Sequence, residues 1–122
     1  MKAHACIFAL LLVGCASSSK HYGMQVSIGT KDVLDDVRIS WDGRSMDFGV
    51  LITDTRFQVS KSSYPVRYPL PAAATITFRK PDGSIVRASV YVPEVVARKV
   101  QETDGYLNFV IYSDREVVAE AR

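Results

Sequence analysis

Few side chains of this sequence could act as nucleophiles, general bases or zinc ligands, and most of them lie near its start. The chain has two cysteines, Cys6 and Cys15, and two histidines, His4 and His21. A catalytic histidine has to be held within hydrogen-bond distance of its nucleophile, and a zinc ion takes three or four His, Cys or carboxylate ligands. Which of these residues the working protein retains therefore depends on the fate of residues 1–14.

Residues 1–14 have the layout of a cleaved secretory signal. Lys2 supplies a positive charge, residues 5–13 are almost continuously apolar, and small residues stand just before Cys15. Such a segment is too short to span a bilayer as a stable helix. The run Leu12-Val13-Gly14-Cys15 resembles a bacterial lipobox, which implies that the sulfur of Cys15 is acylated and that cleavage makes this cysteine the new N-terminus. The alternative is an ordinary signal peptide with a cysteine at its cleavage site by chance.

The resemblance implies a cellular location as well as a lipid anchor. The residue after the cysteine is Ala16 rather than an aspartate, and in Gram-negative lipoproteins an aspartate there favours retention in the inner membrane. The mature protein is therefore expected in the outer membrane, lipid-anchored and facing the periplasm. Several acyl chains on one residue anchor a protein firmly, whereas a single chain binds only marginally. Residues 15–22 then form the acylated cysteine and a short, flexible tether of small and polar residues.

Catalytic and metal sites have little to draw on in residues 15–122. His4 and Cys6 leave with the signal, Cys15 carries lipid, and His21 lies in the tether. We therefore predict no enzyme, no metal site and no cofactor. Carboxylates that could bind calcium remain, but no twelve-residue loop has ligands at alternate positions, so solvated loop side chains are the favoured interpretation. These carboxylates are Asp32, Asp35, Asp36, Asp42 and Asp47.

Length and charge limit the number of domains and the partners. Removing residues 1–14 from the 122 leaves 108, enough for one hydrophobic core and too few for two. The whole chain has 15 Lys and Arg against 13 Asp and Glu, and these charges alternate along it. Because no basic stripe could follow a phosphate backbone, nucleic acid is not an expected partner. No cysteine pair remains for a disulfide, so the domain at 23–122 must hold by packing alone.

Hydrophobic residues of this domain recur with a period of two, which is typical of half-buried antiparallel strands. Asp-Gly and Pro-Asp-Gly sequences supply turns between the apolar runs. Residues 94–103 differ: Pro93 suits the first turn of a helix, and Val96 and Val100 lie four residues apart, so one short helix is predicted, with a crossover loop as the alternative. Seven strands are expected at 23–29, 36–42, 46–53, 55–60, 73–80, 84–92 and 106–112, with 116–121 as a further candidate.

These elements predict a single all-β domain, an antiparallel sandwich of immunoglobulin-like or transthyretin-like type with about seven strands. Trp41, the only tryptophan, is in phase with Val37 and Ile39. It is expected in the core between the two sheets, and the alternative is an exposed anchor at a strand end.

The connection at 61–71 is the segment that we predict to contact a partner. It contains three of the five prolines and is expected to lie along a sheet edge, which proline protects from unwanted pairing. Tyr64, Arg67 and Tyr68 lie close together within it, and tyrosine and arginine are enriched at the hot spots of protein interfaces. These three residues are the predicted partner-binding residues; the alternative is that the tyrosines cap the edge of the core.

Three functions are compatible with the sequence. Taken whole, it is similar to the small lipoproteins encoded beside type VI secretion effectors, in its lipobox, short tether and one compact β domain with Phe48-Gly49-Val50-Leu51, Tyr68-Pro69-Leu70-Pro71 and Pro81-Asp82-Gly83. This resemblance implies an immunity protein that binds and neutralises a periplasm-targeted toxin. The alternative is an accessory or structural lipoprotein of an envelope or secretion machine, which should carry a protruding loop that only residues 61–71 could supply. An enzyme, such as a paired-carboxylate hydrolase, is the least favoured.

Overall fold

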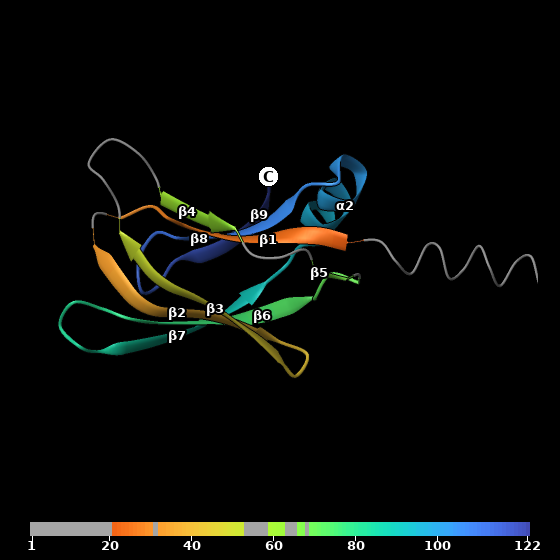
Figure 1. Cartoon of the computed structure of the whole chain (residues 1–122). Coiled ribbons are helices and arrows are strands. Elements are labelled where there is room, and N and C mark those ends of the chain that lie inside the picture. Colours follow the sequence, from red (N-terminus) through yellow and green to blue (C-terminus); the bar gives the residue numbers. More distant parts are fainter. Residues whose placement is uncertain (1–20, 31, 53–58, 63–65, 68) are drawn as a thin grey trace, which may run out of the picture.

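The computed structural model describes residues 21–30, 32–52, 59–62, 66–67 and 69–122. Within these ranges, two β-sheets pack face to face and one helix lies at an end of them (Figure 1). The protein is therefore an all-β sandwich, as its sequence predicts. The elements are β1 (His21–Ile28), β2 (Val33–Trp41), β3 (Arg44–Ile52), β4 (Val59–Ser62), β5 (Val66–Arg67), β6 (Ala73–Arg79), β7 (Ile85–Tyr91), α2 (Glu94–Thr103), β8 (Tyr106–Ile111) and β9 (Val117–Ala121).

One sheet has the order β4-β1-β8-β9, with β5 also paired to β1, and the other has the order β3-β2-β6-β7. Strands β1 and β8 run parallel, from Gly23 opposite Tyr106 to Ile28 opposite Ile111. The other pairings among the described residues are antiparallel. The sequence predicts antiparallel neighbours throughout, so the β1–β8 pair departs from that expectation. A period of two is common to both kinds of pairing and cannot tell them apart.

Alternate residues of each strand fill one core between the sheets. In β1, for example, Met24, Val26 and Ile28 are fully buried. Trp41 is 7% exposed and belongs to this core, which confirms the predicted position and not the alternative of a strand-end anchor. The buried core residues are Tyr22, Met24, Val26, Ile28, Leu34, Val37, Ile39, Trp41, Phe48, Leu51, Val66, Ala74, Ile76, Phe78, Val90, Val92, Val100, Leu107, Phe109 and Ile111.

Strand β2 contains a bulge that shifts its alternation by one residue. Its register with β3 is irregular between Leu34 and Val37, and Asp36 between them has a φ of 50°. Leu34 and Val37 are three residues apart and both are buried. The bulge absorbs the extra residue, so the strand begins at Val33, whereas strict alternation predicts a start at residue 36.

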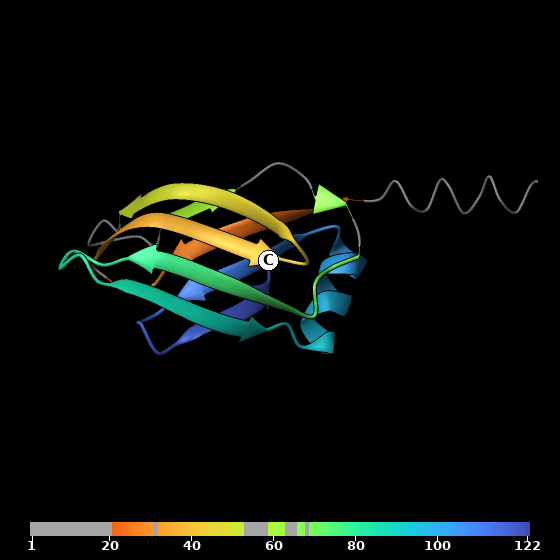
Figure 2. The same cartoon turned by 90° about the horizontal axis from the view of Figure 1, so that it is seen from below.

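Helix α2 has the predicted bounds, 94–103, and the alternative of a crossover loop is wrong. Its N-cap is Pro93, its buried side chain is Val100, and it ends at Asp104 in a left-handed conformation with a φ of 51°. The helix lies where β1 and β8 begin, and we call this end of the sandwich the α2 end. The β1–β2, β6–β7 and β8–β9 connections lie at the opposite end, which we call the loop end (Figures 1 and 2).

Besides the start of β2, two further differences from the predicted strands matter for the site, and the remaining predicted bounds agree to within two residues. Strand β1 begins at His21, two residues before the predicted residue 23, so Tyr22 lies in the core rather than in the tether. The predicted strand at 55–60 lies mostly outside the described residues, and β4 occupies 59–62.

Candidate functional site

Of the predicted partner-binding residues, the structure describes Arg67 alone. Arg67 is exposed on β5 and lies opposite His21 of β1, at the α2 end. Tyr64 and Tyr68 lie outside the described residues, as does the predicted lipidation site Cys15. Within 61–71, residues 61–62 and 66–67 lie along the sheet edge as predicted, because they belong to β4 and β5, which pair with β1.

Apart from Tyr22, which is buried in the core, the other described tyrosines are exposed at separate places. Tyr91 ends β7 and is 69% exposed, and Tyr106 begins β8 and is 40% exposed. The Tyr106 ring lies over Gly23, where a Cβ atom would collide with it. Tyr112 follows β8 at the loop end and is 42% exposed. Among these side chains, only Tyr112 lines a pocket at the loop end.

Several carboxylates that the sequence leaves as solvated loop residues form ion pairs on strand surfaces. Arg79 lies 2.9 Å from Asp36 and 3.8 Å from Asp35, and Arg38 lies 3.6 Å from Asp47. The first pair joins β6 to the bulge of β2, and the second joins β2 to β3. Within the described ranges, no group of three or more His, Cys, Asp and Glu side chains is placed to hold a metal ion.

The loop end contains a pocket with a volume of about 110 Å³. Its apolar residues come from β2, β6 and β8, and its polar residues come from the three connections that meet there. This volume is below the roughly 300–1,000 Å³ of sites for drug-sized ligands, and it suits a single inserted side chain. The pocket is lined by Thr30, Asp32, Leu34, Phe78, Lys80, Ile111, Tyr112, Ser113 and Asp114.

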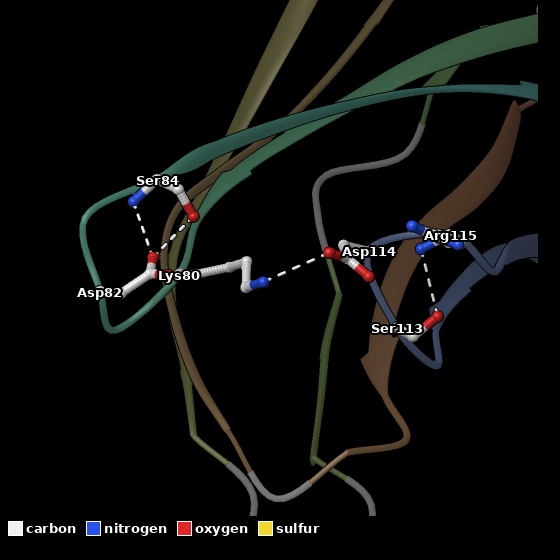
Figure 3. A network of polar contacts seen from close by, with 6 residues as sticks. All are labelled: Lys80, Asp82, Ser84, Ser113, Asp114 and Arg115. Carbon is white, nitrogen blue, oxygen red and sulfur yellow. Dashed lines mark hydrogen bonds and ion pairs between the residues drawn. The ribbon is translucent and has the colours of Figure 1, made fainter.

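An ion pair joins the two hairpins beside this pocket. Lys80 Nζ lies 3.2 Å from Asp114 Oδ2, and the side chain of Lys80 reaches across from the β6–β7 turn to the β8–β9 turn (Figure 3). The two side chains are 30% and 44% exposed, so solvent screens the attraction and its contribution to stability is small. In the β8–β9 turn, the N–H of Arg115 donates to Ser113 Oγ at 3.1 Å.

The β6–β7 turn presents a fixed negative charge next to this ion pair. Asp82 Oδ1 accepts hydrogen bonds from the Ser84 hydroxyl at 2.6 Å and from the Ser84 N–H at 2.9 Å (Figure 3). The hydroxyl bond first, and the N–H bond second, lower the pKa of Asp82 because they stabilise the ionised carboxylate. The loop end therefore has an apolar-floored pocket with an ordered rim of charges and hydroxyls.

Sequence reasoning did not find this pocket. Lys80 and Asp114 are 34 residues apart, and no local spacing connects them. They meet because β8 lies parallel to β1, which brings the end of β8 to the loop end. The exposed Tyr112, which directly follows the buried apolar residues at the end of β8, is the signal that could have pointed to it.

No protein-family model matches the chain, and no curated protein matches it. The chain is similar to an NMR structure of a protein from Eubacterium rectale, with a TM-score of 0.49 and 9% sequence identity, over 85% of this chain and 90% of that chain. Within the described ranges, no helix has the length and apolar character needed to cross a membrane.

Proposed function

We propose that the protein is a non-enzymatic binding module, lipid-anchored at Cys15 in the outer membrane and facing the periplasm. Its partner is a toxin, namely a periplasm-targeted effector of a type VI secretion system, which it neutralises as an immunity protein. The lipobox resemblance supports the anchor, and the resemblance to effector-linked lipoproteins supports the partner. The observation that carries the proposal is that the loop-end pocket lies at the end of the domain opposite to the start of β1, where the tether joins.

The anchor and the pocket lie at opposite ends of the domain. Strand β1 starts at His21, so only residues 16–20 separate it from Cys15 and can extend to about 17 Å. The eight residues of β1 then extend about 25 Å from the α2 end toward the loop end. A partner can therefore reach the loop end without competing with the tether.

This arrangement leads us to assign the partner surface to the loop end. Arg67 lies beside His21 at the attached end, where an anchored protein has the membrane within tether length. Tyr112 offers a broad, exposed contact surface at the pocket, and tyrosine provides such contact at low entropic cost. Lys80 and Asp114 add charges of both signs that can orient a partner. We infer that the toxin inserts one side chain into the pocket that these two residues line and covers the Tyr112 ring.

The scaffold alternative has no supporting observation, so we do not propose it. It expects a protruding loop in 61–71, and residues 63–65 and 68 of that segment lie outside the described residues.

The anchor is tested by replacing Cys15 with serine. Cys15→Ser should abolish acylation, so that the protein stays unprocessed or leaves the outer-membrane fraction, whereas Cys6→Ser should change neither its mature mass nor its fractionation. An unchanged mass and fractionation for Cys15→Ser would contradict the lipoprotein assignment.

The partner surface is tested with the effector encoded beside the gene. Tyr112→Ala should weaken binding by about 2 kcal/mol, as for an interface hot spot, and cells with this variant should be poisoned when the effector is directed to their periplasm. Arg67→Ala is the matched control and should retain full protection.

The outcomes separate the surface from the function. Loss of protection by Arg67→Ala but not by Tyr112→Ala would move the surface back to the α2 end. A wild-type protein that neither binds nor protects against any effector encoded beside it would reject the immunity function.

A further inference from the structure

Strand β7 is an edge strand with an unusual distribution of exposed hydrophobic side chains. Ile85 and Tyr91, at its two ends, are the most exposed large hydrophobic residues of the described chain, at 70% and 69%. Both lie on the outer face of the sheet, together with Arg87 and Ser89. Ile85 lies three residues before Ala88 and Tyr91 three residues after it, so the two exposed hydrophobic side chains are placed symmetrically about Ala88.

The backbone of β7 has one unpaired edge. The N–H of Val92 donates to the carbonyl of Ala72, and the N–H of Lys80 donates to that of Ser84. These bonds fix the phase of the β6–β7 ladder, so that residues 86, 88 and 90 bond to β6. The N–H and C=O groups of residues 85, 87, 89 and 91 therefore point to the open edge, which no other described strand pairs with (Figure 2).

The opposite edge of the same sheet is protected in a way that β7 is not. Strand β3 has an irregular register at Gly49, which has a φ of 69°, and its N–H bonds to the side chain of Asp47. Such irregularities and charges block edge-to-edge pairing. Strand β7 pairs with β6 without interruption from Ile85 to Tyr91, contains no proline or lysine, and has Arg87 as its one charged residue. Its edge is thus suited to accept another strand.

The side of the sandwich next to this edge is also incompletely covered. Strands β7 and β9 lie beside one another across the two sheets. Val86 from β7 and Val117, Ala119 and Ala121 from β9 pack on the core but are only partly buried. A second domain placed against β7 would remove this apolar seam from water.

We propose that a second copy of this chain occupies the edge, and that the two β7 strands pair antiparallel about a two-fold axis at Ala88. The two four-stranded sheets then join into one. In this register, Ile85 of each copy faces Tyr91 of the other, a cross-strand pair of the favourable β-branched and aromatic kind. Arg87 faces Ser89 and lies diagonal both to the other copy's Arg87 and to its Tyr91 ring, the latter within reach for a cation–π contact.

The neighbouring registers are worse, so the complementarity selects this one. Because paired residues must project to the same face, the axis has to pass through a residue, and the nearest alternatives are Arg87 and Ser89. An axis at Arg87 sets two arginines opposite each other, which is unfavourable. An axis at Ser89 moves Ile85 opposite Pro93, beyond the partner's strand and without an N–H donor.

The dimer is independent of the proposed function and compatible with it. Antiparallel pairing places the two α2 ends at opposite ends of the joined sheet, so two anchored copies would lie with their strands along the membrane. The β6–β7 turn of each copy then lies beside the partner's α2 end, whereas Tyr112 and the β8–β9 turn belong to the other sheet and take no part in the joined edge. One strand pair buries less than the roughly 1,600 Å² of a standard interface, so the dimer should form in a concentration-dependent way.

Engineered cysteines in the full chain test both the dimer and its register. Opposite residues at a non-hydrogen-bonded position have Cα atoms about 4.5 Å apart, which a disulfide can bridge. Ala88→Cys should therefore give a disulfide-linked homodimer under mild oxidation, seen on a non-reducing gel with the wild type as background. Ser89→Cys is the matched control. It is more exposed than Ala88, yet in this register it faces Arg87, so its dimer yield should be at least fivefold lower.

A second change tests the side-chain contacts. Tyr91→Lys in the Ala88→Cys chain puts a positive charge beside the partner's Arg87 and should lower the dimer yield at least fivefold. Tyr91 is exposed, so the melting temperature should not change. The proposal is overturned if Ser89→Cys crosslinks as well as Ala88→Cys, if neither crosslinks, or if mass spectrometry finds the cysteine introduced at position 88 joined to a different protein.

Discussion

Replacing Ser27 with alanine should destabilise the domain far more than the loss of one hydroxyl from a strand surface normally does. Ser27 alternates with the core residues Val26 and Ile28, so it lies on the sheet face directed away from the other sheet. It is nevertheless fully buried, as is Asn108 on β8. The Ser27 hydroxyl donates to Asn108 Oδ1 at 2.9 Å.

The magnitude follows from this burial. A neutral hydrogen bond contributes about 1 kcal/mol net, and a buried polar atom left without its partner costs about 1–3 kcal/mol. We therefore expect Ser27→Ala to lower the free energy of unfolding by about 1–3 kcal/mol. For a domain of this size each kcal/mol corresponds to about 4–8 °C in melting temperature. The second contact of Asn108, to Glu120 Oε1 at 3.5 Å, is long and adds little.

A double-mutant cycle measured by urea denaturation isolates this contact. Ser27→Ala, Asn108→Ala and the double variant should show a coupling energy of at least about 0.5 kcal/mol, because residues in contact are not additive. Ser45→Ala, an exposed serine on β3, is the control and should stay within about 0.5 kcal/mol of wild type. Additive single changes, or a Ser27→Ala variant as stable as Ser45→Ala, would refute the reasoning.

Three further predictions concern the core, a helix end and a turn. Trp41→Ala removes a buried aromatic side chain and should cost about 3–5 kcal/mol in thermal or chemical unfolding; an unchanged melting temperature would place Trp41 outside the core. Asp104→Gly should raise stability by about 0.5 kcal/mol, because glycine adopts the left-handed conformation that ends α2 without strain, and a lower melting temperature would contradict this. Because the pKa of Asp82 is lowered in the folded state, its ionised carboxylate stabilises the fold. This contribution is complete at pH values above the ordinary aspartate pKa, and it is lost as the pH falls through the lower pKa of the folded state. In a carboxyl NMR titration, Ser84→Ala should therefore raise the pKa of Asp82, and an unchanged titration curve would contradict the assigned cause.

The sequence predicts the parts of this fold that depend on local spacing. Helix α2 has its predicted bounds because Pro93 and the spacing of Val96 and Val100 are local signals. The hairpin turn at Asp42-Gly43 has the positive φ values that this pair favours. The burial of Trp41 follows from its phase with Val37 and Ile39.

The remainder depends on contacts between distant residues. The bulge at Asp36 breaks the alternation on which strand prediction rests, because only the neighbouring strands determine where an extra residue is accommodated. In the alternation of their strands, Ser27 and Asn108 occupy positions that would normally face solvent. They contact each other although they are 81 positions apart in the chain, so no local pattern predicts their burial. The candidate pocket has the same origin, because its Lys80–Asp114 pair arises from the course of β8 beside β1.

The parallel pairing of β1 with β8 also sets the order in which the domain can fold. Strands β2, β3, β6 and β7 all lie between residues 33 and 91, so their sheet can assemble once that part of the chain has been synthesised. One side of β1 must wait for a strand that begins at residue 106. Such long-range pairing slows folding and leaves apolar surface exposed in the meantime. A nascent chain that stops short of β8 would leave one edge of β1 unpaired and the core without Leu107, Phe109 and Ile111. Chaperones and proteases would then compete for the exposed apolar surface.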